Sequence, residues 1–158
     1  MKISEANCIF CELIKNETPQ HCIYEDSLFI ILLDKESLGF GHCIIIPKMH
    51  VSKIYELDDN IYRELFALAK KLSGILKNLP RNMYSPNYTA FANTGALAPI
   101  DISIAYTAFG SGIQHAHLHL VPHNNSDILI NPSKYIKNLN EDELRNNTKT
   151  IQDFIKRN

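Results

Sequence analysis

Three histidines spaced two residues apart, His115, His117 and His119, constrain the fold of this chain more than any other feature of its sequence. Side chains in a β-strand point alternately to its two faces, with a period of two residues. On a strand over residues 115–121 the three imidazoles therefore share one face, and the apolar spacers between them line the other. At a rise of about 3.3 Å per residue, neighbouring imidazoles lie about 6.5–7 Å apart. The pattern predicts a strand whose apolar face packs on the core and whose histidines face a site.

A row of imidazoles suits chemistry on a phosphate group. Imidazole has a reference pKa of about 6.5, so it serves as nucleophile, acid or base near neutral pH. Flanking imidazoles can donate hydrogen bonds to phosphate oxyanions. We therefore predict that His117, which has a helper on each side, is the attacking group. The alternative is a half-polar strand whose histidines face water, but the regular triplet, followed by Val121 and Pro122, favours the reactive site.

Four further segments have the composition of strands. They are rich in β-branched and apolar residues and are bounded by glycine, proline or polar pairs. These segments span residues 21–25, 27–34, 43–46 and 87–93. Antiparallel succession is the simplest arrangement of the first three.

Two segments have helical periodicity. The longer one begins after Asp58 or Asp59, either of which can cap it, and stops at Pro80. Its apolar residues repeat at helical spacing and are Ile61, Leu65, Leu68, Leu72, Ile75 and Leu76. The tail from residue 140 to 155 carries a weaker apolar stripe. Strands, one long helix and then strands again predict an α+β domain with an antiparallel sheet.

Composition and charge narrow the classes of function. The 158 residues are 45% hydrophobic and 21% charged, which fits one globular domain. A net charge of −1 argues against a nucleic-acid partner or a polybasic contact with a membrane. No apolar run approaches the roughly 20 residues needed to span a bilayer, and the amino terminus lacks a secretory apolar stretch. We expect a cytoplasmic protein with no nucleic-acid or membrane partner and no organic cofactor.

Cys8 and Cys11 form a C-x-x-C pair. Without an export signal such a pair favours metal binding or redox work over a disulfide. Zinc takes about four ligands in a structural site. His50, which follows the segment 43–46, and His115 would complete a closed Cys₂His₂ site. The alternative is two buried thiols and an unrelated histidine.

Together these motifs resemble the histidine-triad (HIT) family. The triplet with apolar spacers resembles the family signature His-φ-His-φ-His-φ-φ, where φ is apolar. Further landmarks appear in the family's order at residues 8–14, 23–26, 33–34, 41–50 and 93–95. The chain is most similar to the zinc-bearing, bacterial-type branch of the Hint/Fhit-like superfamily. The resemblance implies a HIT-like fold with a five-stranded antiparallel sheet, one long central helix and a C-terminal helix. It also implies a single domain over residues 1–158, with a motif-bearing core at 7–123 and a tail at 124–158.

The resemblance implies a role for each matching residue. His117 is the nucleophile, forming a nucleotidyl-histidine intermediate, and His119 contacts the α-phosphate. The expected nucleotide and phosphate contacts are Phe10 and Ile14 near the base, Asp34 at the ribose hydroxyls, and Asn93, Ser111 and Gly112 at the phosphate. Zinc-bearing members use two cysteines and two histidines that match Cys8, Cys11, His50 and His115. The implied partners are a purine nucleotide or dinucleotide substrate and a second copy of the chain in a homodimer.

The expected function is a nucleotide-binding hydrolase or transferase, either a phosphoramidase or a dinucleoside polyphosphate hydrolase. The alternative is a catalytically weak nucleotide-binding or scaffold protein. Its support is Ser111 where the family usually has glutamine, and His123 where arginine is common. A third class, a catalytic metal site built from the three triplet histidines, is disfavoured. On a straight strand they would span about 13 Å, which is too far for one ion.

Some residues depart from the family pattern or have no assigned role. An apolar insertion at residues 97–109 is consistent with a lid, an extra strand pair or a dimer contact. His123 is expected either in solvent at a strand end or in a functional role. His21 and His42 are expected to be structural or on the surface, and Cys22 and Cys43 to be inert apolar residues.

Overall fold

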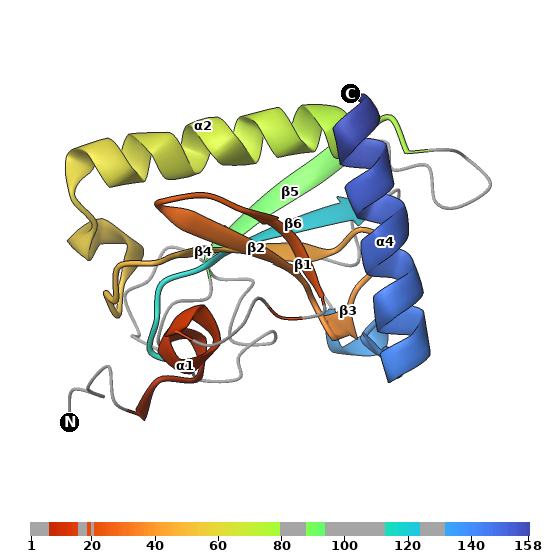
Figure 1. Ribbon diagram of the computed structural model, residues 1–158, viewed down its shortest axis with the longest axis horizontal. Coiled ribbons are helices and arrows are strands. Elements are labelled where there is room, and N and C mark those ends of the chain that lie inside the picture. The colour runs from red at the N-terminus through yellow and green to blue at the C-terminus, as the bar shows by residue number, and fades with distance from the viewer. Residues whose placement is uncertain (1–6, 16–18, 20, 80–87, 94–112, 124–131) are drawn as a thin grey trace.

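A twisted antiparallel sheet forms the centre of the molecule in the computed structural model (Figure 1). The structure describes residues 7–15, 19, 21–79, 88–93, 113–123 and 132–158, and for 88–93 it describes the backbone. Within these residues the main sheet has five strands in the order β1-β2-β4-β6-β5. Its strands are β1 (Cys22–Glu25), β2 (Phe29–Leu33), β4 (Cys43–Pro47), β5 (Tyr88–Asn93) and β6 (Leu118–His123). A separate pair is formed by β3 (Glu36–Ser37) and β7 (Lys137–Asn138).

Helices cover both faces of this sheet (Figure 1). The longer ones are α2 (Asp59–Leu76) and α4 (Glu141–Arg157), and α1 (Ile9–Lys15) is short. Single 3-10 turns lie at η2 (Ile54–Glu56) and η3 (Pro132–Lys134). No helix in the described segments is both long enough and apolar enough to cross a bilayer.

The side chains of β2 pack in two apolar layers, one on each face of the sheet. Ile31 and Leu33 pack in the larger core with residues of α2 and α4. The intervening residues Ile30 and Leu32 point to the other face and pack with residues of α1. This alternation follows from the period of two along a strand. The sequence of β2 is therefore apolar throughout, because both of its faces are buried.

The helices begin where their sequences provide caps. Asp58 caps α2 by accepting a hydrogen bond from the backbone N–H of Asn60. Asn140 caps α4, and Glu143 returns a bond to the backbone N–H of Asn140. Each helix then presents one apolar stripe to the larger core, which includes Leu65, Ala69, Leu72 and Leu76 of α2 and Leu144 and Ile151 of α4.

The α+β fold, the antiparallel sheet and the two longer helices confirm the prediction from the sequence. The triplet differs in one respect, because β6 begins at Leu118 rather than at residue 115. His115 sits in a bend, so only His119 of the three lies on the strand. Helix α1 was not predicted, since it is only seven residues long. The apolar insertion at 97–109 lies outside the described residues.

Two glycines are expected to respond to alanine with opposite signs. Gly41 precedes β4 with φ of 82°, and an added Cβ would lie 3.3 Å from Leu79 Cδ1. Gly41→Ala is expected to destabilise the fold by about 1–2 kcal/mol. Gly74 lies in α2 with nothing within 4 Å of an added Cβ, so Gly74→Ala is expected to stabilise by about 0.5–1 kcal/mol. Urea midpoints of the two variants test this, and equal shifts of the same sign would contradict it.

Candidate functional site

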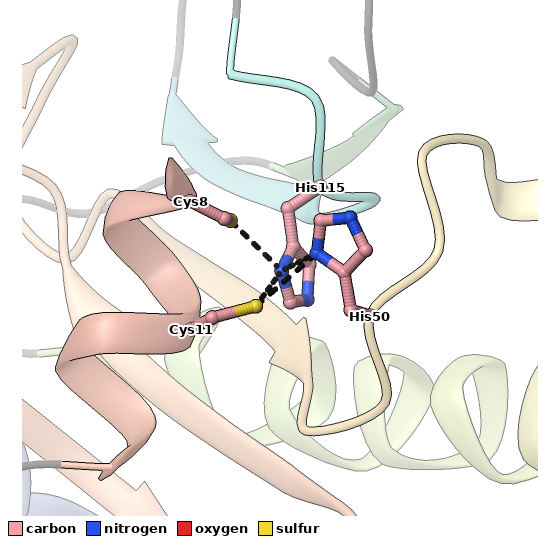
Figure 2. Close-up of side chains that lie close together, drawn as sticks. All are labelled: Cys8, Cys11, His50 and His115. Carbon is pink, nitrogen blue, oxygen red and sulfur yellow. Dashed lines mark hydrogen bonds between the residues drawn. The ribbon is translucent and has the colours of Figure 1, made fainter. Parts of the chain in front are cut away.

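Four potential metal ligands meet between α1 and the sheet (Figure 2). Cys8 immediately precedes α1, Cys11 lies in its first turn, His50 follows β4, and His115 precedes β6. His115 Nδ1 lies 3.4 Å from Cys8 Sγ, 3.5 Å from Cys11 Sγ and 3.3 Å from His50 Nδ1. Cys11 Sγ lies 3.1 Å from His50 Nδ1. Segments that are distant in the sequence thus bring four donor atoms to one point.

The arrangement of these donors fits zinc. With Zn–N of about 2.0–2.1 Å and Zn–S of about 2.3 Å, tetrahedral ligand atoms lie about 3.3–3.8 Å apart. The observed separations are within a few tenths of an ångström of that range. His115 Nε2 lies 2.8 Å from the carbonyl oxygen of Pro47 and donates to it. That bond fixes the proton on Nε2 and gives Nδ1 the lone pair that a metal needs.

His117 is held by the backbone of His115, one of the four candidate metal ligands. Its Nδ1 lies 2.7 Å from the carbonyl oxygen of His115. A carbonyl only accepts, so Nδ1 carries the proton and the lone pair lies on Nε2. Phe10 packs edge-on against this ring, with centroids 5.1 Å apart. Burial lowers the pKa of His117 to about 4, so its imidazole is neutral at pH 7.

His119 belongs to a triangle with His42 and Asp34. His42 Nε2 lies 2.8 Å from His119 Nδ1. Asp34 Oδ2 lies 3.5 Å from His42 Nε2 and 3.4 Å from His119 Nδ1. The backbone N–H of Leu38 donates to His42 Nδ1 at 3.1 Å, so the neutral ring carries its proton on Nε2. His42 therefore donates to His119.

This triangle is a hydrogen-bond relay rather than a second metal site, although its three donor atoms are close enough for an ion. A metal would need a lone pair on His42 Nε2. The Leu38 N–H donates to His42 Nδ1, so in the neutral ring the lone pair is on Nδ1 and the proton is on Nε2. Burial lowers the pKa of His42 to about 3, and burial raises the pKa of Asp34 to about 7. His42 is therefore neutral at pH 7, while the Asp34 carboxyl is close to its own midpoint.

A cavity of about 300 Å³ opens onto the reactive side chains. His117, His119 and Asp34 line one part of it. The apolar part is lined by Ile9, Phe10, Leu13, Leu32, Ile44 and Ile113. Its size and its combination of an apolar wall with a few polar groups are typical of a small-molecule site.

The HIT domain family matches residues 15–126, which is more than half of the sequence. The chain belongs to the HIT family. An uncharacterized HIT-like protein from Borreliella burgdorferi is 31% identical over 125 residues, covering 77% of this chain and 78% of that protein. The adenosine 5′-monophosphoramidase of Candida albicans is 30% identical over 123 residues, covering 75% of this chain and 72% of that enzyme.

A solved structure shares the fold of this HIT chain. It is a Zn-bound histidine triad family protein from Mycobacterium smegmatis, with a TM-score of 0.71 and 20% sequence identity. The match covers 98% of this chain and 96% of that one. At this level of identity the comparison concerns the fold alone.

Some of the residues expected to contact the nucleotide lie together at the cavity, and others do not. Phe10 and Asp34 line the cavity, but Ile14 packs in the apolar cluster behind α1, and Leu13 lines the cavity instead. Asn93 is described by its backbone, which pairs with Leu118 at the start of β6. Ser111 and Gly112 lie outside the described residues.

The histidines outside the triplet lie in different environments. His42, expected to be structural or on the surface, is fully buried and contacts His119, so the sequence analysis missed a residue of the site. His123 is fully buried at the end of β6, which rules out the first of its two expected environments, a ring in solvent. His21 is half-buried and is one of the residues that line the cavity. Cys22 and Cys43 are buried thiols outside the metal-ligand group, as predicted.

Proposed function

We propose that this chain is a nucleotidyl hydrolase or transferase that cleaves a phosphoramidate or phosphoanhydride bond of a purine nucleotide. The observation that carries the proposal is the state of His117. Its Nδ1–H is committed to the His115 carbonyl, so a neutral imidazole with its lone pair on Nε2 lines the cavity. A neutral, oriented nitrogen is what a nucleophilic histidine needs. Homology to an adenosine 5′-monophosphoramidase supports the same class of reaction.

In the first step, His117 Nε2 attacks the α-phosphorus and the bond to the amine or phosphate leaving group breaks. The new N–P bond makes the imidazole cationic, and the His115 carbonyl stabilises that charge through Nδ1–H. In the second step water attacks phosphorus, the electron pair of the N–P bond returns to His117 Nε2, and nucleoside monophosphate leaves as the water gives up one proton to solvent, which restores neutral His117. Splitting one displacement into two lowers each barrier.

Other residues would bind and orient the nucleotide. The apolar wall at Phe10 and Leu13 suits a purine base, and the Asp34 carboxylate suits the two ribose hydroxyls. His119 Nδ1 accepts a hydrogen bond from His42 Nε2–H, so the proton of the neutral His119 ring is on Nε2. From there it can be donated to a phosphate or leaving-group atom. Asn93, Ser111 and Gly112 are proposed phosphate contacts by their place in the family pattern.

The donor set of Cys8, Cys11, His50 and His115 would hold a structural zinc ion. Bound there, zinc would crosslink α1 to the segments that follow β4 and precede β6. His115 would then be fixed through its side chain while its carbonyl orients His117. The homodimer, the cytoplasmic location and the single domain over 1–158 stay predictions from the family resemblance.

A substrate panel with trapping of the intermediate tests this function. Wild-type protein is incubated with adenosine and guanosine phosphoramidates, dinucleoside polyphosphates and nucleotide sulfates, and released nucleoside monophosphate is quantified. We expect turnover of at least one substrate, and one added nucleotidyl group in the mass of enzyme quenched at alkaline pH. If calorimetry detects nucleotide binding but no substrate is turned over, the proposed hydrolase function is wrong, and the catalytically weak binding protein takes its place.

A further inference from the structure

Phe10 contacts both the reactive histidine and His115, one of the four candidate metal ligands. Its side chain is buried, and its ring meets His117 edge-on, with centroids 5.1 Å apart and ring planes at 80°. It meets His115 in the same way, at 5.8 Å and 78°. Aromatic rings prefer such edge-to-face pairs, which add a directional attraction to the burial of the rings. One phenyl ring therefore packs against both imidazoles.

The beginning of α1 and the residue before it carry two rows of side chains, and Phe10 belongs to the row at the cavity. Residues three apart lie next to each other on a helix surface. Cys8 and Cys11 form one such pair, and both sulfur atoms lie near His115 (Figure 2). Phe10 and Leu13 form the other pair, and both line the cavity. The position of the Phe10 ring therefore depends on how the cysteine pair meets the histidines.

The hydrogen bond from His117 to the His115 carbonyl fixes one atom of the reactive ring. Nδ1 donates to that oxygen at 2.7 Å, and a bond at one ring atom holds that atom more tightly than it holds the plane of the ring. The contact with Phe10 restricts the plane as well. An attacking nitrogen must be aligned with phosphorus, and a displacement of about 1 Å lowers the rate of reaction strongly.

We propose that Phe10 is a positioning residue, whose ring holds the His117 imidazole in the orientation for attack and links that orientation to the docking of α1. This inference rests on the proposed function, and it goes beyond the contact with the base that the family resemblance implies for Phe10. A wall of the base site acts on nucleotide binding, whereas a support for His117 acts on the rate of attack. The two roles therefore separate in KM and kcat.

The kinetic test compares three variants of α1. Phe10→Leu removes the ring but keeps an apolar side chain at the cavity, so it should lower kcat about 10-fold and keep KM within about threefold of wild type. Phe10→Tyr retains the ring and should keep kcat within about twofold. Leu13→Ala is the matched control, because it opens the same apolar wall. It should raise KM about fivefold and change kcat by less than about twofold.

A spectroscopic test separates this inference from the proposed function, because it needs no turnover. Spectra of protein labelled with ¹⁵N-histidine report the Nδ1–H of His117, which burial and the bond to the His115 carbonyl protect from exchange with water. Phe10→Leu should speed this exchange about 10-fold, whereas Phe10→Tyr and Leu13→Ala should leave it within about twofold of wild type. The zinc content of each variant is measured as well and should equal that of the wild type.

The possible results distinguish the roles of Phe10. If Phe10→Leu raised KM but left kcat and the Nδ1–H exchange unchanged, Phe10 would be a wall of the base site alone, and the inference would be overturned. Loss of zinc from Phe10→Leu would show that the ring acts through the metal ligands, and would overturn it too. If the wild type turned over no substrate while the exchange rates differed as expected, the proposed hydrolase would be wrong and the positioning contact would stand.

Discussion

Substituting alanine for His117 is expected to lower product formation by about 10³-fold or more, while nucleotide binding stays measurable. The variant removes the nitrogen that would form the N–P bond, whereas the apolar wall and Asp34, which would hold the nucleotide, are unchanged. Single-turnover assays and calorimetry on the same preparation measure the two quantities. The mass of one added nucleotidyl group should be absent from quenched His117→Ala.

Chemical rescue distinguishes a lost nucleophile from a damaged pocket. His117→Gly leaves a space beside Phe10, whose ring packs against His117 in the wild type. Free imidazole should enter this space and restore part of the activity with saturable dependence on its concentration. Activity in His117→Ala within tenfold of wild type would show that another group attacks phosphorus, and the nucleotidyl-histidine mechanism would be wrong.

The fold could be predicted because its longer elements are each marked by a pattern in their own segment of the sequence. Strand β2 is a continuous apolar run, and α2 has both a cap at Asp58 and a regular stripe. The four candidate metal ligands were also chosen from the sequence, because a structural zinc site needs about four ligands and the C-x-x-C pair supplies two of them. Their proximity agrees with the proposal that two cysteines and two histidines form one site.

The register of the sheet is what the sequence could not provide. Ile44 of β4 pairs with His119 of β6, so His42, two residues before Ile44, falls on the same face as His119. Nothing in the isolated sequence around Gly41 and His42 specifies that pairing, and His42 was therefore missed. The bend at His115 was also not predicted: the strand expected from residue 115 begins at Leu118, and the bend lets His115 contact Cys8.

Leu13 and Ile14 illustrate a related limit. Neighbouring residues on a helix point about 100° apart. Knowing that α1 lies beside the cavity does not say which of the two faces it. That choice depends on how α1 is rotated, which the cysteine contacts and the packing of Phe10 decide. Leu13 lines the cavity, and Ile14 packs in the cluster with Leu32 and Ile46.

Cys11→Ser is expected to abolish stoichiometric zinc binding and to lower the stability of the fold by about 4 kcal/mol or more, a size typical of losing a metal. Serine oxygen is a much poorer zinc ligand than thiolate. At about 2–4 °C per kcal/mol for a chain of this size, the melting temperature should fall by about 8–16 °C. Metal analysis and calorimetry measure the two changes.

The matched control is Cys22→Ser, which also removes a buried thiol but lies outside the metal-ligand group. A serine there can still donate to the Tyr24 carbonyl, as the thiol does. This variant should therefore keep its zinc and most of its stability. If Cys11→Ser kept wild-type zinc content, the four-residue site would be wrong. If Cys11→Ser lost its zinc but lost no more stability than Cys22→Ser, the metal would not be holding α1 to the sheet.

The expected result links the zinc site to the reactive histidine. Zinc would fix His115 through its side chain, and the His115 carbonyl orients His117. Metal loss should accordingly lower kcat even at temperatures where the protein remains folded.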